Sequence, residues 1–182
     1  MDFKLVLGKL LTTFNEQNIR YALIGGMALG AWGVPRGTVD IDFLVHNDDL
    51  EKVDGIMTGL EYECKYRSEN VSQYISCLQI FGEVDFLHAF RTPSLSMLQR
   101  TVEKEIFGGS LSIKVLKIED IIGLKLQGMG NDETRKAMDL SDIESLMAAN
   151  KDSLDWGLIK EYFDLFECDG LFRRLREIYG DD

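Results

Sequence analysis

Two aspartates separated by one residue, Asp40 and Asp42, are the residues of this 182-residue chain best placed to do chemistry. They lie in a segment, residues 38–46, whose polar and apolar side chains alternate, and this pattern predicts a β-strand with one buried face. Side chains at positions i and i+2 of a strand point to the same side, so both carboxylates can bind one divalent cation or bridge two. The sequence therefore predicts an acidic metal site on the open face of this strand.

A third carboxylate from a neighbouring strand would complete a two-metal site, which stabilises the attacking and leaving oxygens in phosphoryl transfer. Asp85 is the natural candidate, because it lies in a second alternating segment, residues 83–88. Glu83 shares its face and is the competing candidate. Acidic pairs alone carry little information, since about five acid-x-acid pairs are expected by chance from this composition and seven occur.

A glycine pair, Gly25 and Gly26, follows a short apolar run at residues 21–24 and precedes a helical pattern of small residues. Backbone N–H groups at such a strand-to-helix turn are directed toward a ligand and suit a triphosphate. Alone, a glycine pair is most often a structural corner. Its position shortly before the two aspartates favours a functional role.

Together these segments resemble the nucleotidyltransferase signature of the DNA polymerase β superfamily, in which a glycine turn leads into a strand with Asp-x-Asp. The resemblance is specific over residues 21–45 and extends more weakly toward residue 146. This form is most similar to AbiEii-type and related uncharacterised bacterial nucleotidyltransferases, and it is also similar to lincosamide and aminoglycoside nucleotidyltransferases. The resemblance implies an α+β fold with a nucleotidyltransferase-like mixed β-sheet flanked by helices.

The resemblance also implies roles for particular residues. Asp40 and Asp42 would bind two catalytic Mg²⁺ ions. Asp85 would ligate one of them and help to activate the attacking hydroxyl. The nucleoside triphosphate would be bound by a second set of residues: Gly25, Gly26, Arg36, Thr38 and Lys125.

The role of the helical segment that follows Lys125 is open. Asp139 and Asp142 would line or support the site, but the family usually has Lys-Asp adjacent, whereas Met138 precedes Asp139 here. Arg135 and Asp139 are four residues apart, which equally fits an ordinary ion pair on a solvated helix face.

Apolar periodicity predicts a sheet-containing domain at residues 1–117 and a C-terminal helical segment packed on it at residues 118–182. Strands are expected in residues 21–24, 38–46, 62–67, 73–81, 83–88, 102–107 and 110–116, and helices in residues 3–14, 27–32, 50–60, 118–127, 132–149, 155–166 and 171–179.

Three details of this prediction concern turns and caps. Residues 47–49, Asn-Asp-Asp, are expected to cap the helix that follows them. Gly108 and Gly109 predict a two-residue hairpin turn. Residues 128–131, which contain two glycines, are expected to separate two helices.

The composition excludes several classes of protein. Lys and Arg number 20 against 31 Asp and Glu, and the net charge of −11 disfavours binding to duplex DNA. The longest uncharged stretch, residues 21–35, is shorter than the roughly 20 apolar residues of a membrane helix, and no signal peptide is evident, so a cytoplasmic location is expected. The three cysteines lack the spacing of a zinc site. His88, at a predicted strand end, is expected to be an ordinary surface residue.

We therefore expect a Mg²⁺-dependent nucleotidyltransferase that transfers NMP from an NTP to an acceptor hydroxyl and releases pyrophosphate. The acceptor would be a small molecule, a protein or a tRNA end. The alternative is a non-catalytic module of the same fold that senses a nucleotide or binds a protein partner, as an antitoxin-like protein does.

Overall fold

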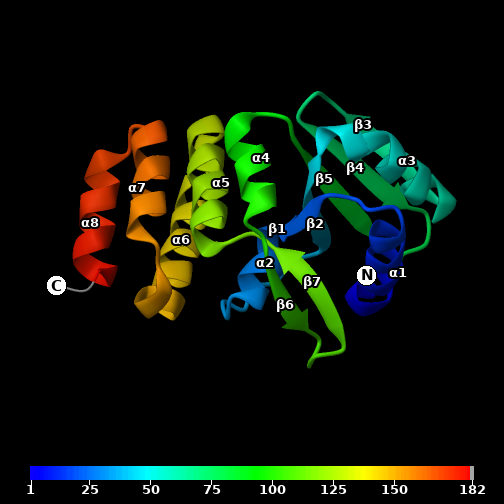
Figure 1. The fold of residues 1–182 in the computed structure, drawn as a ribbon, viewed down its shortest axis with the longest axis horizontal. Coiled ribbons are helices and arrows are strands. Elements are labelled where there is room, and N and C mark those ends of the chain that lie inside the picture. The colour runs from blue at the N-terminus through cyan, green and yellow to red at the C-terminus, as the bar shows by residue number, and fades with distance from the viewer. Residues whose placement is uncertain (181–182) are drawn as a thin grey trace. The chain divides into compact units, whose positions relative to one another are not determined.

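The computed structural model describes residues 1–180, and the chain divides into two compact units (Figure 1). The first unit comprises Met1–Ala31 and Arg36–Leu116, and the second comprises Trp32–Pro35 and the chain from Lys117 onward. That these units are separate domains, divided after residue 117, stays a prediction.

The first unit is built on a seven-stranded mixed sheet with the strand order β3-β4-β5-β2-β1-β7-β6 (Figure 1). The β2·β5 and β1·β7 pairs are parallel, and the other pairs are antiparallel. The strands are β1 (Tyr21–Ile24), β2 (Asp40–His46), β3 (Tyr62–Arg67), β4 (Val71–Ser76), β5 (Glu83–Ala89), β6 (Val102–Ile106) and β7 (Leu111–Val115). The predicted fold class, a mixed sheet flanked by helices, is confirmed.

An aromatic cluster buries one face of the central strands. The ring of Phe14, on α1 (Phe3–Glu16), lies 5.4 Å from that of Phe43 on β2 and 6.3 Å from that of Phe86 on β5. All three side chains are fully buried. Because successive residues of a strand point to opposite sides, this burial turns the residues that alternate with them in β2 and β5 toward the other face of the sheet. Register is thereby fixed, since a slip of one residue would expose the aromatic rings.

Three further α-helices belong to this unit: α2 (Gly25–Ala31), α3 (Leu50–Gly59) and α4 (Thr92–Gln99). Helix α4 was not predicted, because its short sequence begins Thr-Pro-Ser and buries only Met97 fully. A single 3-10 turn, Asn47–Asp49, precedes α3. The predicted cap is wrong in detail: the carboxylate of Asp49 makes no cap bond and instead accepts hydrogen bonds from Arg20 at 2.8 and 3.1 Å.

Two other expectations about the first unit need correction. The β6–β7 loop has four residues rather than two, because Ile106 pairs with Leu111, and positive φ angles occur at residues 107, 108 and 109. His88 is buried rather than at the surface: its Nε2 lies 3.0 Å from Ser72 Oγ, and its Nδ1 lies 2.9 Å from the Glu69 carbonyl oxygen. Burial lowers the pKa of His88, so the neutral imidazole is favoured there.

The second unit is helical, with α5 (Ile118–Asn131), α6 (Lys136–Asn150), α7 (Trp156–Leu165) and α8 (Asp169–Tyr179). The 3-10 turns Glu133–Arg135 and Lys151–Ser153 precede and follow α6. Helix α5 packs against α6 and α7. It continues through residues 128–131, so the predicted break there is wrong. Glycine in a helix costs only about 1 kcal/mol relative to alanine, which the buried apolar face of α5 outweighs.

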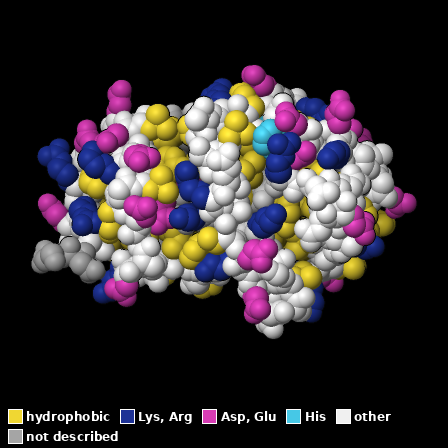
Figure 2. Space-filling view, viewed as in Figure 1, with side chains coloured by type: hydrophobic (Ala, Val, Ile, Leu, Met, Phe, Trp, Pro, Cys, Tyr) yellow, Lys and Arg dark blue, Asp and Glu magenta, His cyan; other side chains and the backbone are white. Residues whose placement is uncertain are grey.

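Acidic and basic side chains are interspersed on the face drawn in Figure 2. No helix within residues 1–180 combines the length and the apolar composition needed to cross a membrane.

Candidate active site

Three half-buried carboxylates lie together on the face of β2 and β5 that is opposite to Phe43 and Phe86. Asp42 of β2 is directly opposite Asp85 of β5 in the parallel pair, and Asp40 is two residues before Asp42. One oxygen from each of the three groups lies within 4.8 Å of the other two. The structure thus brings together the three aspartates that the sequence singled out. Glu83, the competing candidate, pairs with Asp40 in the register but is not a member of this group.

The two oxygens of Asp85 have different surroundings. Gln73 of β4 donates a hydrogen bond from Nε2 to Asp85 Oδ2 at 2.8 Å. Asp85 Oδ1 is buried and has no hydrogen-bond partner among residues 1–180. Burial raises the pKa of Asp85, Gln73 opposes that rise, and the nearby charge of Asp40 adds to it. The site therefore holds an acidic group whose charged form is short of partners.

Glu83 shares this electrostatic environment. Burial raises the pKa of its carboxyl group, and the charges of Asp85 and Asp40 raise it further. Removing these charges from water without a cation is unfavourable, so the cluster favours either protons or a bound cation.

Asp40 is held by a neighbour in sequence. Thr38 donates a hydrogen bond from Oγ1 to Asp40 Oδ1 at 2.6 Å. Thr38 was predicted to bind the nucleotide, and the structure shows its hydroxyl bound to an aspartate.

The glycine pair packs directly against these side chains. Gly25 has a φ of +65°, and a Cβ atom built on it would lie 1.9 Å from Asp42 Oδ2. A Cβ on Gly26 would lie 2.8 Å from Thr38 Cβ. Both positions therefore need glycine for close approach, and Gly25 also needs it for its backbone conformation. The N-terminus of α2 is placed beside the carboxylates by this contact.

The two predicted cationic ligands of the triphosphate lie in different units. Arg36 is half-buried in the segment between α2 and β2, in the first unit. Lys125 is on α5, in the second unit. Its Nζ donates hydrogen bonds to Asp139 Oδ1 at 2.8 Å and to Asp142 Oδ2 at 2.6 Å, and all three residues are buried.

Arg135 completes the cluster around Lys125. Its Nε lies 3.3 Å from Asp139 Oδ2, as the i,i+4 spacing predicted, but the Asp139 side chain is fully buried rather than solvated. Lys125 therefore links α5 to α6 through two carboxylates.

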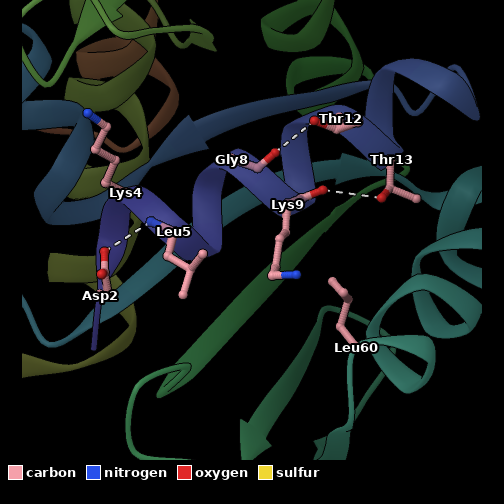
Figure 3. A pocket seen from close by; sticks show the side chains of 8 residues that line it. All are labelled: Asp2, Lys4, Leu5, Gly8, Lys9, Thr12, Thr13 and Leu60. Atoms are coloured by element: carbon pink, nitrogen blue, oxygen red, sulfur yellow. Dashed lines mark hydrogen bonds between the residues drawn. The ribbon is translucent and has the colours of Figure 1, made fainter.

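A shallow depression of about 730 Å³ lies beside α1 (Figure 3). The side chains of Asp2, Thr12 and Thr13 in its lining already have hydrogen-bond partners. Asp2 Oδ1 accepts the Leu5 N–H at 3.0 Å, and the hydroxyls of Thr12 and Thr13 donate to backbone carbonyls one turn earlier. The residues that line it are Asp2, Lys4, Leu5, Gly8, Lys9, Thr12, Thr13 and Leu60. They include none of the clustered aspartates.

The mixed sheet, with three carboxylates on a parallel strand pair, matches the nucleotidyltransferase fold of the solved structures described below. The sequence model of a family described as "Uncharacterised nucleotidyltransferase" matches residues 4–175. The chain belongs to this family and is therefore a transferase by membership. No curated protein matches the sequence significantly.

Three solved structures show the same fold. The antibiotic-resistance factor ANT(2'')-Ia, solved in solution, has a TM-score of 0.66 and 16% identity over 97% of this chain and 98% of that chain. The lincosamide antibiotic adenylyltransferase LnuA, bound to lincomycin, has a TM-score of 0.56 and 17% identity over 79% and 95%. An antigenic nucleotidyltransferase-like protein from Paracoccidioides brasiliensis has a TM-score of 0.57 and 17% identity over 97% and 92%.

Proposed function

We propose that this protein is a Mg²⁺-dependent enzyme that transfers NMP from an NTP to an acceptor hydroxyl. The observation that carries the proposal is the group of Asp40, Asp42 and Asp85, whose oxygens lie within 4.8 Å of one another. The glycine turn packs against this group, since a Cβ atom built on Gly25 would lie 1.9 Å from Asp42 Oδ2.

The residues fit a divalent cation. Carboxylate oxygens are the ligands that Mg²⁺ prefers, and Asp85 Oδ1 is a buried acceptor without a hydrogen-bond partner within residues 1–180. The mutual repulsion of the three charges would be relieved by cations bound between them. Bound Mg²⁺ would supply positive charge for the phosphate oxygens and make the acceptor hydroxyl more acidic.

The protein's own residues would then perform three tasks. Asp40 and Asp42 would hold the metal ions. Asp85 accepts the proton of the acceptor hydroxyl, whose oxygen forms a bond to the α-phosphorus of the NTP. The bond from that phosphorus to the bridging oxygen breaks, and its electron pair leaves with pyrophosphate. The triphosphate would be bound by backbone N–H groups of Gly25 and Gly26 and by Arg36.

We infer that the acceptor is a small hydroxylated molecule rather than a tRNA end or a protein. One ANT(2'')-Ia structure contains adenylyl-2''-tobramycin, and LnuA is bound to lincomycin. The net charge of −11 also disfavours RNA as the acceptor. We also propose that the protein is related to AbiEii-type nucleotidyltransferases and has a protein partner in a toxin–antitoxin pair. We propose a cytoplasmic location as well.

Calorimetry of ATP binding with and without Mg²⁺ tests the proposal. We expect the wild type to bind ATP only with Mg²⁺ and the double variant Asp40→Asn/Asp42→Asn to lose this binding. The matched control is Glu103→Gln/Glu105→Gln, which removes two charges of the same i,i+2 spacing from β6, where both residues are exposed. Equal binding by the wild type and the aspartate variant, or no binding by either, would refute the metal site.

Incubation with each α-labelled NTP and a cell extract then identifies the acceptor. The proposal predicts Mg²⁺-dependent label in the small-molecule fraction. Metal-dependent ATP binding without transfer of label to any fraction would instead support the non-catalytic, nucleotide-sensing alternative.

A further inference from the structure

The side chain of Gln73 extends the row of site residues by one strand. In the sheet register Gln73 of β4 is directly opposite Asp85 of β5, which is directly opposite Asp42 of β2. The three side chains therefore lie in one line across the sheet, on the same face. Gln73 is half-buried, and its Nε2 lies 2.8 Å from Asp85 Oδ2.

In the contact between Gln73 and Asp85, Gln73 donates and the ionised Asp85 accepts. A carboxylate only accepts hydrogen bonds, so the amide must present its NH₂ group rather than its oxygen. This bond holds Asp85 Oδ2 and leaves Asp85 Oδ1 buried, with no hydrogen bond to any residue from 1 to 180. The two oxygens are thus made unequal by Gln73.

Repulsion within the cluster makes such a bond necessary. One carboxylate oxygen of Asp40 and one of Asp85 lie within 4.8 Å of each other, so their negative charges repel. Without a donor on its far side, the Asp85 carboxylate can turn away from Asp40 toward water. The bond from Gln73 keeps it facing the other two carboxylates.

Thr38 does the same for the other flank of the cluster, since its hydroxyl holds Asp40 Oδ1. Both donors are neutral. A lysine or arginine in either place would also orient the carboxylate but would cancel the negative charge that attracts a cation. Neutral donors orient the acidic groups and leave their charge intact.

We propose that Gln73 is a positioning residue that fixes Asp85 Oδ1 as the atom that faces the metal ion and the acceptor hydroxyl. The inference rests on the proposed function, and it assigns a role to a residue outside the glycine and aspartate motifs.

Mn²⁺ binding to the metal-free protein, measured by electron paramagnetic resonance, tests the role of Gln73 without using enzyme activity. Gln73→Met keeps the length of the side chain and removes the donor. We expect about a 10- to 100-fold weaker Mn²⁺ affinity, the usual effect of losing a group that orients a metal ligand. Gln73→His retains an N–H donor and should recover part of the affinity. Gln79→Met, in the exposed β4–β5 loop, is the control and should bind Mn²⁺ as the wild type does.

A thermal melt of each metal-free variant separates positioning from folding. Gln73→Met should keep the melting temperature of the wild type within a few degrees while its Mn²⁺ affinity falls. If it fails to fold, Gln73→Thr, which favours a strand and is too short to reach Asp85, replaces it. Once an acceptor is known, kcat should fall by a similar factor with little change in the KM for ATP.

The outcomes distinguish the two proposals. If the wild type binds Mn²⁺, the Asp40→Asn/Asp42→Asn variant does not, and a folded Gln73 variant binds it like the wild type, the role of Gln73 is overturned and the metal site stands. If the wild type and the aspartate variant bind Mn²⁺ equally, the proposed function itself fails.

Discussion

Replacing Gly25 with alanine tests whether the glycine turn is required for contact with the acidic site. The new Cβ would lie 1.9 Å from Asp42 Oδ2, whereas an ordinary contact begins near 3.4 Å. Asp42 would have to move by about 3.4 − 1.9 = 1.5 Å. A displacement of about 1 Å in a catalytic group costs on the order of 100-fold in rate. We therefore expect Gly25→Ala to lose at least about 100-fold in nucleotidyl transfer and to bind Mn²⁺ more weakly.

The stability cost of Gly25→Ala has two parts. A non-glycine residue in the left-handed region costs about 1 to 2 kcal/mol, and the forced contact adds about 1 to 3 kcal/mol. The lower entropy of the unfolded alanine variant returns about 0.4 to 1 kcal/mol. The free energy of unfolding should therefore fall by about 1 to 5 kcal/mol.

Two other glycines separate backbone strain from contact. Gly108, in the β6–β7 loop, has a φ of +66° with no atom within 4 Å of a built Cβ, so Gly108→Ala imposes the strain alone. It should cost about 1 kcal/mol and leave Mn²⁺ binding unchanged. Gly26→Ala imposes contact without positive φ. Its Cβ would displace Thr38 by about 3.4 − 2.8 = 0.6 Å and so should weaken Mn²⁺ binding less than Gly25→Ala does.

Urea denaturation of the metal-free variants gives the stability changes, and Mn²⁺ titration gives the state of the site. If Gly25→Ala binds Mn²⁺ and transfers nucleotide like the wild type, the close packing of the turn on Asp42 is not needed for function. If Gly108→Ala damages the site as much as Gly25→Ala, the effect of Gly25→Ala cannot be assigned to contact.

The remaining predictions concern charged groups. Asp85→Asn should stabilise the metal-free protein at neutral pH, since burial and the charge of Asp40 raise the pKa of Asp85. The two carboxylates have oxygens within 4.8 Å of each other. At that separation two unit charges repel by about 3.5 kcal/mol at an effective dielectric constant near 20, and exposure to water reduces this to about 1 to 2 kcal/mol. A carboxyl group whose pKa is raised by folding destabilises the folded state as pH rises and the group ionises. The gain in melting temperature of Asp85→Asn should therefore disappear at pH 3, and a gain that persists at pH 3 would contradict this assignment. Lys125→Met should lower the free energy of unfolding by about 3 to 5 kcal/mol, because two buried carboxylates lose their cation; a loss below 1 kcal/mol in urea denaturation would disprove this role. Burial would raise the pKa of Asp49, but hydrogen bonds from Arg20 outweigh it and lower the pKa. Its stabilising effect should be present at neutral pH and disappear as pH falls below the ordinary carboxyl range, so Asp49→Asn should melt earlier than the wild type only above that range.

The central part of the site could be predicted from sequence because its signals are local. Alternation along residues 38–46 fixed which side chains of β2 face together, and Asp40 and Asp42 follow from that alone. The choice between Glu83 and Asp85 could not be made, because both lie on the same face of β5. It depends on the register of β5 with β2, which is set by long-range packing of buried rings such as Phe43 on Phe86.

The contribution of Gln73 carries no sequence signal of its own. An amide in a strand is common, and only its register opposite Asp85 gives it a contact with the site. Lys125 was found through the resemblance, but the two buried aspartates that bind it depend on how α5 packs on α6. His88 was misjudged for the same reason, since strand-end position does not reveal that Ser72 and a backbone carbonyl enclose it.

The parallel pairing of β2 with β5 also has a consequence for how the protein reaches its folded state. Asp42 and Asp85 become neighbours only after α3, β3 and β4 have been traversed, since all three lie between them in the chain. Closing such a long connection is a slow, non-local step in folding. During synthesis, a chain that has emerged only as far as β2 has two of the three carboxylates and no complete metal site. Acquisition of high-affinity Mn²⁺ binding would therefore mark the completion of the central sheet. Its time course during refolding would report the rate at which β5 pairs with β2.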